Sequence, residues 1–264
     1  MLMLLVPIPF AQRVWALPFL TRLAPSEHYY EGKTRAPKKL TDWLRQALLQ
    51  IRRWLPDRAI VFVADSSYAV IDLLANLIQL LTPITMVVRF RLDAALYEPV
   101  PARRPGQQGR PRKKGARLPT LAHVALNPHT RWQRHSMRYW YGEVKRVIEI
   151  TSGTAVWFHC GHPAVPLRWV IVRDPRGKFK TQALLCTDLQ ATPQQIVNWF
   201  VQRWQLEVTF RDVRETSPLR ARRPPCWGCS PSLPCWPIAW LNVVKCSHGE
   251  PRGTPSHAPP SAMR

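Results

Sequence analysis

Acidic residues are scarce in this sequence, and none occurs before Glu27. The 264 residues carry 16 Asp and Glu against 38 Lys and Arg, which gives a formal net charge of +22. A field this positive favours a polyanionic partner, because neutralised phosphates release counterions and the field steers their approach. Nucleic acid is therefore the first expectation. An anionic membrane surface, or a basic protein without chemistry, stays open on charge alone.

Long hydrophobic runs are also lacking. No stretch approaches the roughly 20 apolar residues that a membrane-spanning helix needs. Residues 1–20 have no basic start, are interrupted by Arg13 and contain three prolines, which is atypical of a signal peptide. Four of the six cysteines lie after residue 216, and the CWGC at 226–229 is a weak zinc signal without a second ligand pair. We expect a cytoplasmic protein with no membrane partner.

Apolar residues make up 46% of the chain, enough for one good-sized core. The runs at 2–8 and 13–20 predict an antiparallel hairpin. Residues 38–55 have apolar positions at helical spacing, and AIVFVA at 59–64 predicts a buried central strand. The residues that follow Asp65 predict a helix over 66–81 and then a strand over 84–92.

The middle of the chain changes composition. Residues 103–117 hold seven basic residues and no acid, with Pro and Gly that predict an exposed loop. Beyond it, β-branched and aromatic residues predict a β-rich insertion, and a hairpin over 168–174 and 179–188 returns to the core. We expect four units: 1–98 and 166–215 form the core, 99–165 is the insertion, and 216–264 is a tail.

A well-marked helix start precedes the tail. Thr192 and Gln195 form a capping box around Pro193, so one helix is predicted over 193–215. After Glu215, ten of the 27 prolines fall within 49 residues and no periodicity persists. Such a tail buries too little surface to offset its ordering entropy, and we expect it to be largely disordered.

Two acids have positions of interest. At about 100° per residue, Phe200, Arg203, Glu207 and Arg214 form one helix stripe, in which arginines flank Glu207. A surface ion pair explains this spacing equally simply. Asp65 follows the central strand, where ligands of α/β sheets gather, but an Asp there also caps a following helix.

Together, VFVADSSYAV and FVQRWQLEVTFRDVRE resemble the second and third acidic blocks of DDE transposases from bacterial insertion sequences. In the relevant subgroup the third block reads Tyr, two residues, Arg, three residues, Glu, six residues, Lys. Here it stands as Phe200, Arg203, Glu207 and Arg214, with two conservative departures. The resemblance covers residues 1–215.

The resemblance implies an α/β fold, namely an RNase H-like mixed sheet flanked by helices. It further implies that Asp65 and Glu207 are catalytic ligands of Mg²⁺ or Mn²⁺. Two such ions, about 4 Å apart, serve in-line attack on a DNA phosphodiester. Arg203 and Arg214 would contact double-stranded DNA or orient Glu207, and relatives act as dimers. The loop cations Arg110, Arg112, Lys113 and Lys114 are expected to track phosphates.

One expected part is absent from the pattern. In the family a first strand carries another catalytic Asp, but only two strands precede the helix at 38–55, and neither Asp42 nor Asp57 can substitute. We therefore expect an N-terminally truncated transposase of low activity, with a frameshift after Glu215. The alternative is a non-catalytic basic DNA-binding protein that keeps the fold as a scaffold.

Aromatic residues in the insertion leave two interpretations open. Trp132, Trp140 and Tyr141 lie near basic residues and could stack on unpaired bases. They are more simply the core of the insertion, because large apolar rings usually bury.

Overall fold

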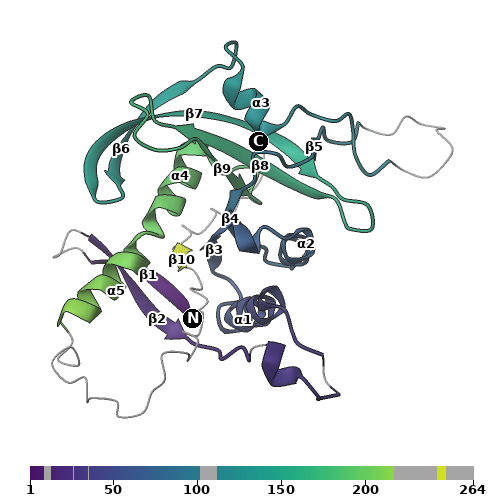
Figure 1. Ribbon diagram of the computed structural model, residues 1–264, viewed down its shortest axis with the longest axis vertical. Coiled ribbons are helices and arrows are strands. Elements are labelled where there is room, and N and C mark those ends of the chain that lie inside the picture. The colour runs from purple at the N-terminus through teal and green to yellow at the C-terminus, as the bar shows by residue number, and fades with distance from the viewer. Residues whose placement is uncertain (9–12, 26, 35, 102–111, 217–242, 248–264) are drawn as a thin grey trace, which may run out of the picture.

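The computed structural model (Figure 1) describes residues 1–8, 13–25, 27–34, 36–101, 112–216 and 243–247. The strands are β1 (Leu2–Ile8), β2 (Arg13–Leu20), β3 (Ala59–Ala64), β4 (Ile84–Phe90), β5 (Leu96–Tyr97), β6 (Gln133–Trp140), β7 (Glu143–Trp157), β8 (Val165–Arg173), β9 (Gln182–Cys186) and β10 (Val243–Ser247). The helices are α1 (Leu40–Trp54), α2 (Ile71–Ile78), α3 (Leu121–Leu126), α4 (Pro193–Gln202) and α5 (Gln205–Thr216).

All described strands belong to one sheet, in the order β2-β1-β10-β3-β4-β9-β8-β7-β5, with β6 paired to β7. The β3–β4 and β1–β10 pairs are parallel and the others are antiparallel. The predicted hairpins β1–β2 and β8–β9 are confirmed. This mixed sheet with helices on both faces confirms the predicted fold class.

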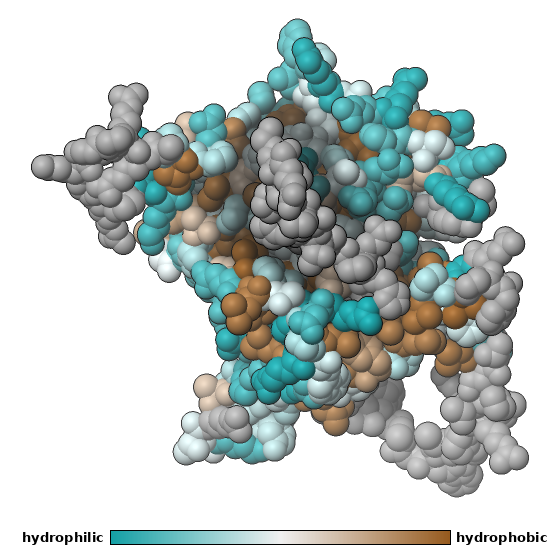
Figure 2. Space-filling view, turned by 180° about the vertical axis from the view of Figure 1, so that it is seen from behind, coloured by the Kyte–Doolittle hydropathy of each residue, from teal (hydrophilic) through white to brown (hydrophobic). Residues whose placement is uncertain are grey.

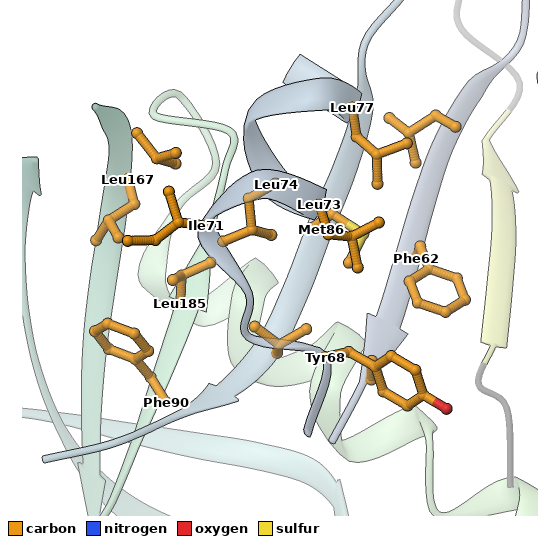
Figure 3. Close-up of a cluster of buried hydrophobic side chains, with 14 of the residues drawn as sticks. Phe62, Tyr68, Ile71, Leu73, Leu74, Leu77, Met86, Phe90, Leu167 and Leu185 are labelled. Carbon is orange, nitrogen blue, oxygen red and sulfur yellow. The ribbon is translucent and has the colours of Figure 1, made fainter. Parts of the chain in front are cut away.

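Alternation along the central strands divides the interior into two cores. Ile60 and Phe62 of β3 pack in the core beneath α1 and α2, whereas Val61 and Val63 pack in the core beneath α4. Figure 3 shows α2 lying over the first core, with Leu74 of the helix on the same side of the sheet as Met86 of β4 and Leu185 of β9. Burial on both faces explains why β3 is a continuous apolar run.

Two predicted boundaries were wrong. The helix expected over 66–81 is a 3-10 turn, η3 (Ser66–Tyr68), followed by the shorter α2. Pro83 restricts only Thr82, since the residue before a proline avoids the helical region, and α2 ends before that point, at Ile78. Strand β4 ends at Phe90, two residues before the predicted end.

The β-rich region after residue 112 extends the sheet. The long strand β7 pairs with β5, β6 and β8, and a close approach pins its centre: a Cβ on Gly153 would lie 2.6 Å from Cζ2 of its cross-strand partner Trp169. Helix α3 was not predicted. The end of the basic loop is also ordered against β5, because Gly115 N–H donates to the Glu98 carbonyl at 2.9 Å.

The tail contains a strand that the sequence did not predict. Residues 243–247 form β10, which lies in the sheet between β1 and β3. The expectation of a largely disordered tail stays a prediction for the other residues of the tail. The rest of the tail, including the CWGC motif, lies outside the described residues.

Candidate active site

Asp65 lies directly after β3, at the edge where the parallel strands β3 and β4 end. Its backbone carbonyl accepts a hydrogen bond from Tyr68 N–H at 3.1 Å, which closes the turn η3. Its side chain makes no capping hydrogen bond, although Asp65 occupies the N-cap position. The capping interpretation of Asp65 is therefore not supported, and its carboxylate, 47% exposed, is directed to another partner.

That partner comes from the junction of α4 and α5. The capping box is confirmed, with Gln195 N–H donating to Thr192 Oγ1 at 3.3 Å and Thr192 N–H donating to Gln195 Oε1 at 2.9 Å. The single helix predicted over 193–215 was wrong, because a turn at Arg203 and Trp204 separates α4 from α5.

Hydrogen bonds in the turn show why the helix is broken there. Arg203 N–H donates to the Phe200 carbonyl and Trp204 N–H to the Val201 carbonyl, which is the tighter three-residue spacing. The turn changes the predicted stripe: Phe200 is buried in the core under α4, and Glu207 lies in the first turn of α5. A carboxylate there is favoured by the helix dipole.

Arg203 joins the two acids. Its Nη2 lies 3.4 Å from Asp65 Oδ1, and its Nη1 lies 3.9 Å from Glu207 Oε1. The Arg203 side chain is only 17% exposed, whereas Glu207 is 49% exposed. The Nε of Arg203 is buried, with no hydrogen-bond partner among the described residues. One guanidinium thus holds two carboxylates that are 142 residues apart in the sequence.

The second arginine of the predicted stripe points elsewhere. Arg214 is exposed in the last turn of α5, and its Nε donates to the Phe210 carbonyl at 3.3 Å. No contact between Arg214 and Glu207 occurs among those found in the described part of the chain. Of the two arginines, only Arg203 flanks Glu207.

Tyr141 is a neighbour of this group that the sequence did not tie to it. It forms, with Gly142, the tight turn between β6 and β7, and both residues have positive φ, as a type I′ turn requires. The Tyr141 ring packs edge-on against Trp204, with centroids 5.6 Å apart. Burial raises the pKa of Tyr141, while the charge of Arg203 opposes the increase. The hairpin tip therefore packs on the α4–α5 turn beside the carboxylates.

The aromatic residues of the insertion are largely core. Trp140 is buried and packs 5.0 Å from the Phe179 ring, and the Arg173 guanidinium lies 3.8 Å from the ring centroid of Trp132. These contacts favour a packing role over base stacking for both tryptophans.

The predicted basic loop is described only in part. Arg110 lies outside the described residues, and Arg112 and Lys113 are exposed. Lys114 is half-buried, because its Nζ lies 3.8 Å from the ring centroid of Tyr97 and 4.9 Å from that of Phe158. On the face of the molecule that Figure 2 shows, hydrophilic residues cover much of the upper part.

Two other carboxylates, those of Glu149 and Asp174, form ion pairs with arginines. Glu149 of β7 contacts Arg134 at 3.1 Å and Arg173 at 2.8 Å, its partners on the two adjacent strands. The hydrogen bond from Arg173 lowers the pKa of Glu149. Asp174 accepts from buried Arg146 at 2.5 Å and closes the β8–β9 turn. Both acids are therefore paired with arginines within the β-rich region.

The carboxylates of Asp65 and Glu207 are chemically suited to binding a divalent metal ion. Carboxylate oxygens are the ligands that Mg²⁺ and Mn²⁺ prefer, and both side chains are half-exposed. Within the described residues, no group of three or more His, Cys, Asp or Glu comes together as a metal site. The residues therefore supply two carboxylates, with Arg203 between them.

A mixed sheet flanked by helices, with an acid where the central strand ends, defines a nuclease-type fold that is consistent with the RNase H-like class. The chain matches the DDE superfamily endonuclease family over residues 2–169, and it belongs to that family. The match includes Asp65 and ends before α4, so the place of Glu207 rests on the geometry above. No curated protein matches the chain. No helix in the described ranges has the length and apolarity to span a membrane.

Proposed function

We propose that this chain is a DDE-type transposase of a bacterial insertion sequence, of the Tyr-Arg-Glu-Lys subgroup, acting on double-stranded DNA. The observation that carries the proposal is the meeting of Asp65 and Glu207 at one guanidinium. A surface ion pair alone would explain Glu207, but it would not bring the acid of the central strand to the same place.

In this proposal Asp65 and Glu207 hold Mg²⁺ or Mn²⁺. The bound metal would activate a water or 3′ hydroxyl and stabilise charge at the phosphodiester. Arg203 keeps the two carboxylates together before substrate binds, and it contacts a phosphate in the DNA complex. Arg214, Arg112 and Lys113 are exposed and attract the DNA backbone.

We expect weak activity from this site. Two carboxylates neutralise less metal charge than three, and Arg203 competes with the metal for the same oxygens. Strand transfer should therefore be slow or absent in this chain, as expected of a defective element.

The test is metal-dependent nicking of a supercoiled plasmid. Wild-type chain with Mn²⁺ should convert supercoiled DNA to the nicked form slowly, and Asp65→Asn and Glu207→Gln should each abolish the conversion. The exposed Glu31 is a matched control, so Glu31→Gln should nick like wild type. Equal nicking by all four proteins would show that the cleavage does not come from this site.

A non-catalytic DNA-binding protein is the second candidate. The low exposure of Arg203 favours it, because a guanidinium that already neutralises both acids forms a stable scaffold without metal. That candidate predicts full plasmid binding in Glu207→Gln and no effect of Mn²⁺ on any variant. DNA binding with no metal response in wild type would select it.

The change of composition after Glu215 has its own explanation in this proposal. A frameshift there would replace apolar helical sequence with the Pro-rich and Cys-rich tail. Translation of the source DNA in the other two frames past that codon should restore an amphipathic helical pattern. Its absence from both frames would exclude a frameshift.

Three further expectations belong to this proposal. The chain would act in the cytoplasm and bind transposon ends as a homodimer. The units at 1–98 and 166–215 would form the catalytic core around the insertion at 99–165, with 216–264 as a tail. Sedimentation of the chain with and without a DNA duplex would show whether two copies bind one duplex.

A further inference from the structure

We propose that Tyr141, at the tip of the β6–β7 hairpin, is a positioning residue of the candidate active site. Its ring holds Trp204 in the turn between α4 and α5. The same turn places Arg203 and Glu207 beside Asp65. What the carboxylates do rests on the proposed function, whereas the role of Tyr141 rests on its own contacts. Tyr141 itself is assigned no contact with substrate.

The backbone conformation of Tyr141 is unusual for a tyrosine. Tyr141 and Gly142 form a two-residue loop, since Trp140 pairs with Glu143 on the adjacent strand. Their φ angles are 45° and 89°, as a type I′ turn requires. Asn, Asp or Gly is the usual first residue of such a turn, because the left-handed region is unfavourable for a bulky side chain. A tyrosine kept in this conformation indicates that its side chain has a role outside the turn.

The Tyr141 ring contacts the start of α5. It packs edge-on against Trp204, with 5.6 Å between the ring centroids and 87° between the ring planes. Trp204 lies just before α5, and its carbonyl accepts from Glu207 N–H at 3.0 Å and from Val208 N–H at 3.2 Å. The ring contact is therefore made to the residue that begins α5, directly after Arg203.

Other residues anchor the hairpin to the core. Trp140 is buried and packs 5.0 Å from the Phe179 ring, and Met137 is buried in the same core. The Trp140 ring also lies 5.1 Å from the Tyr141 ring, at 85° to it. Tyr141 is therefore backed by an anchored residue, and its half-buried ring is available to support Trp204.

Arg203 needs support from its surroundings. Its contacts with Asp65 and Glu207 are long, at 3.4 and 3.9 Å, and its buried Nε has no hydrogen-bond partner among the described residues. Short bidentate hydrogen bonds would fix a guanidinium by themselves. Here the turn that carries Arg203 has to hold it in place, and the ring of Tyr141 packs on that turn.

The charges of the site reach Tyr141. Burial raises the pKa of Tyr141 above its ordinary value, and it is the largest influence. The positive charges of Arg203 and Arg89 oppose the increase in pKa. The negative charges of Glu207 and Asp65 add to it. This is consistent with a ring that lies beside the group formed by Arg203 and the two acids.

Hydrogen exchange of the full chain tests the contact without any metal. Tyr141→Asn suits the turn but removes the ring. Amide exchange in peptides from 203–208 should rise about two- to tenfold, as loss of one aromatic pair implies. Exchange in 133–140 and 59–64 should stay as in wild type. Tyr141→Phe keeps the ring and should exchange like wild type, as should the control Tyr29→Asn, which removes an exposed ring elsewhere.

Removal of the other ring gives an independent measurement. Trp204→Leu should also raise exchange in 203–208, and the double variant with Tyr141→Asn should not exceed the larger single effect, because both variants lose the same contact. Unchanged exchange in Tyr141→Asn, or additive effects in the double variant, would overturn the proposal. A rise that extends to 59–64 would overturn it as well, because it would show general destabilisation.

Mn²⁺ affinity tests the link from Tyr141 to the carboxylates. Electron paramagnetic resonance of free Mn²⁺ should show about two- to tenfold weaker binding by Tyr141→Asn, because a displaced turn separates Glu207 from Asp65. Tyr141→Phe should bind like wild type. Equal affinity in wild type and Tyr141→Asn would refute the positioning role. No binding by wild type would contradict the proposed function instead, and the exchange measurements would then decide the role of Tyr141 alone.

Discussion

At the scale of single residues, Arg203 decides how the two acids meet. It contacts Asp65 and Glu207 at 3.4 and 3.9 Å, and it is less exposed than either carboxylate. Such contacts are each worth about 0.2–1 kcal/mol at a partly exposed site. The same residue therefore organises the carboxylates and competes with any cation that approaches them.

Removal of Arg203 should separate these two effects. We predict that Arg203→Ala binds Mn²⁺ about two- to five-fold more tightly than wild type, because ion pairs of this strength no longer oppose the metal. Electron paramagnetic resonance of free Mn²⁺ measures the affinity. Arg203→Lys keeps the charge and should bind like wild type. Weaker binding by Arg203→Ala would mean that Arg203 is needed to position the carboxylates for the metal.

Glu149 gives a prediction for the dependence of stability on pH. Its pKa is lowered in the folded protein from an ordinary value of 4.5, so its contribution is present above that pH and is lost as the pH falls through the folded pKa. Glu149→Gln should lower the free energy of unfolding by about 1 kcal/mol at pH 7. Urea denaturation should show the difference shrinking below about pH 4.5. A constant difference down to pH 3 would exclude an ionic cause.

The sequence alone could single out Asp65 and Glu207 as candidate site residues, since an acid after a buried strand and an acid in a marked helix are local patterns. It could not show that the Asp65 side chain makes no capping hydrogen bond or that Tyr141 lies nearby. Those facts depend on where the β6–β7 turn and the α4–α5 turn pack, which involves residues far apart in the chain.

At the scale of elements, local sequence signals specify the start of α4 more fully than any other part of the site. The capping box and Pro193 fix the helix entry, and buried Phe200 fixes its end against the core. Arg203 follows immediately, so its position depends on both.

Loss of the cap should be measurable. Thr192→Ala should destabilise the chain by about 1 kcal/mol in urea denaturation, because a helix donor loses its partner. Thr192→Ser retains the hydroxyl and should be nearly neutral. Equal loss in both variants would indicate that the methyl group, rather than the cap, supports α4.

Elements with a local cause were predictable, and those with a distant cause were not. Helix α1 and strand β3 follow from apolar spacing within each segment. The break after Gln202 leaves no proline or glycine signal, and β10 pairs with β1 and β3, which are far from it in the sequence. A short segment of the tail is therefore ordered by the sheet and not by its own pattern.

At the scale of the whole molecule, the net charge of +22 predicts strongly salt-dependent DNA binding. We expect Arg112→Gln with Lys113→Gln to reduce the slope of log affinity against log salt by about 1.8, because each lost phosphate contact removes about 0.9. The control pair Lys39→Gln with Arg53→Gln, exposed at the two ends of α1, should change the slope less. Fluorescence anisotropy with a labelled duplex measures it.

A substitution of Lys114 tests whether this lysine contacts DNA or packs against the protein. Because its ammonium lies against Tyr97 and Phe158, Lys114→Gln should change the salt slope by less than about 0.9. A full decrease would show that DNA draws Lys114 away from the rings.

The central claim is that Asp65 and Glu207 form one divalent-metal site, and the shift of the thermal unfolding midpoint with Mn²⁺ tests it most directly. Metal at ten times its dissociation constant should stabilise wild type by about 1.4 kcal/mol. The midpoint should rise in wild type and in the control Asp42→Asn, on α1, and stay constant in Asp65→Asn and Glu207→Gln. An equal rise in all four proteins, or no rise in wild type, would contradict the account.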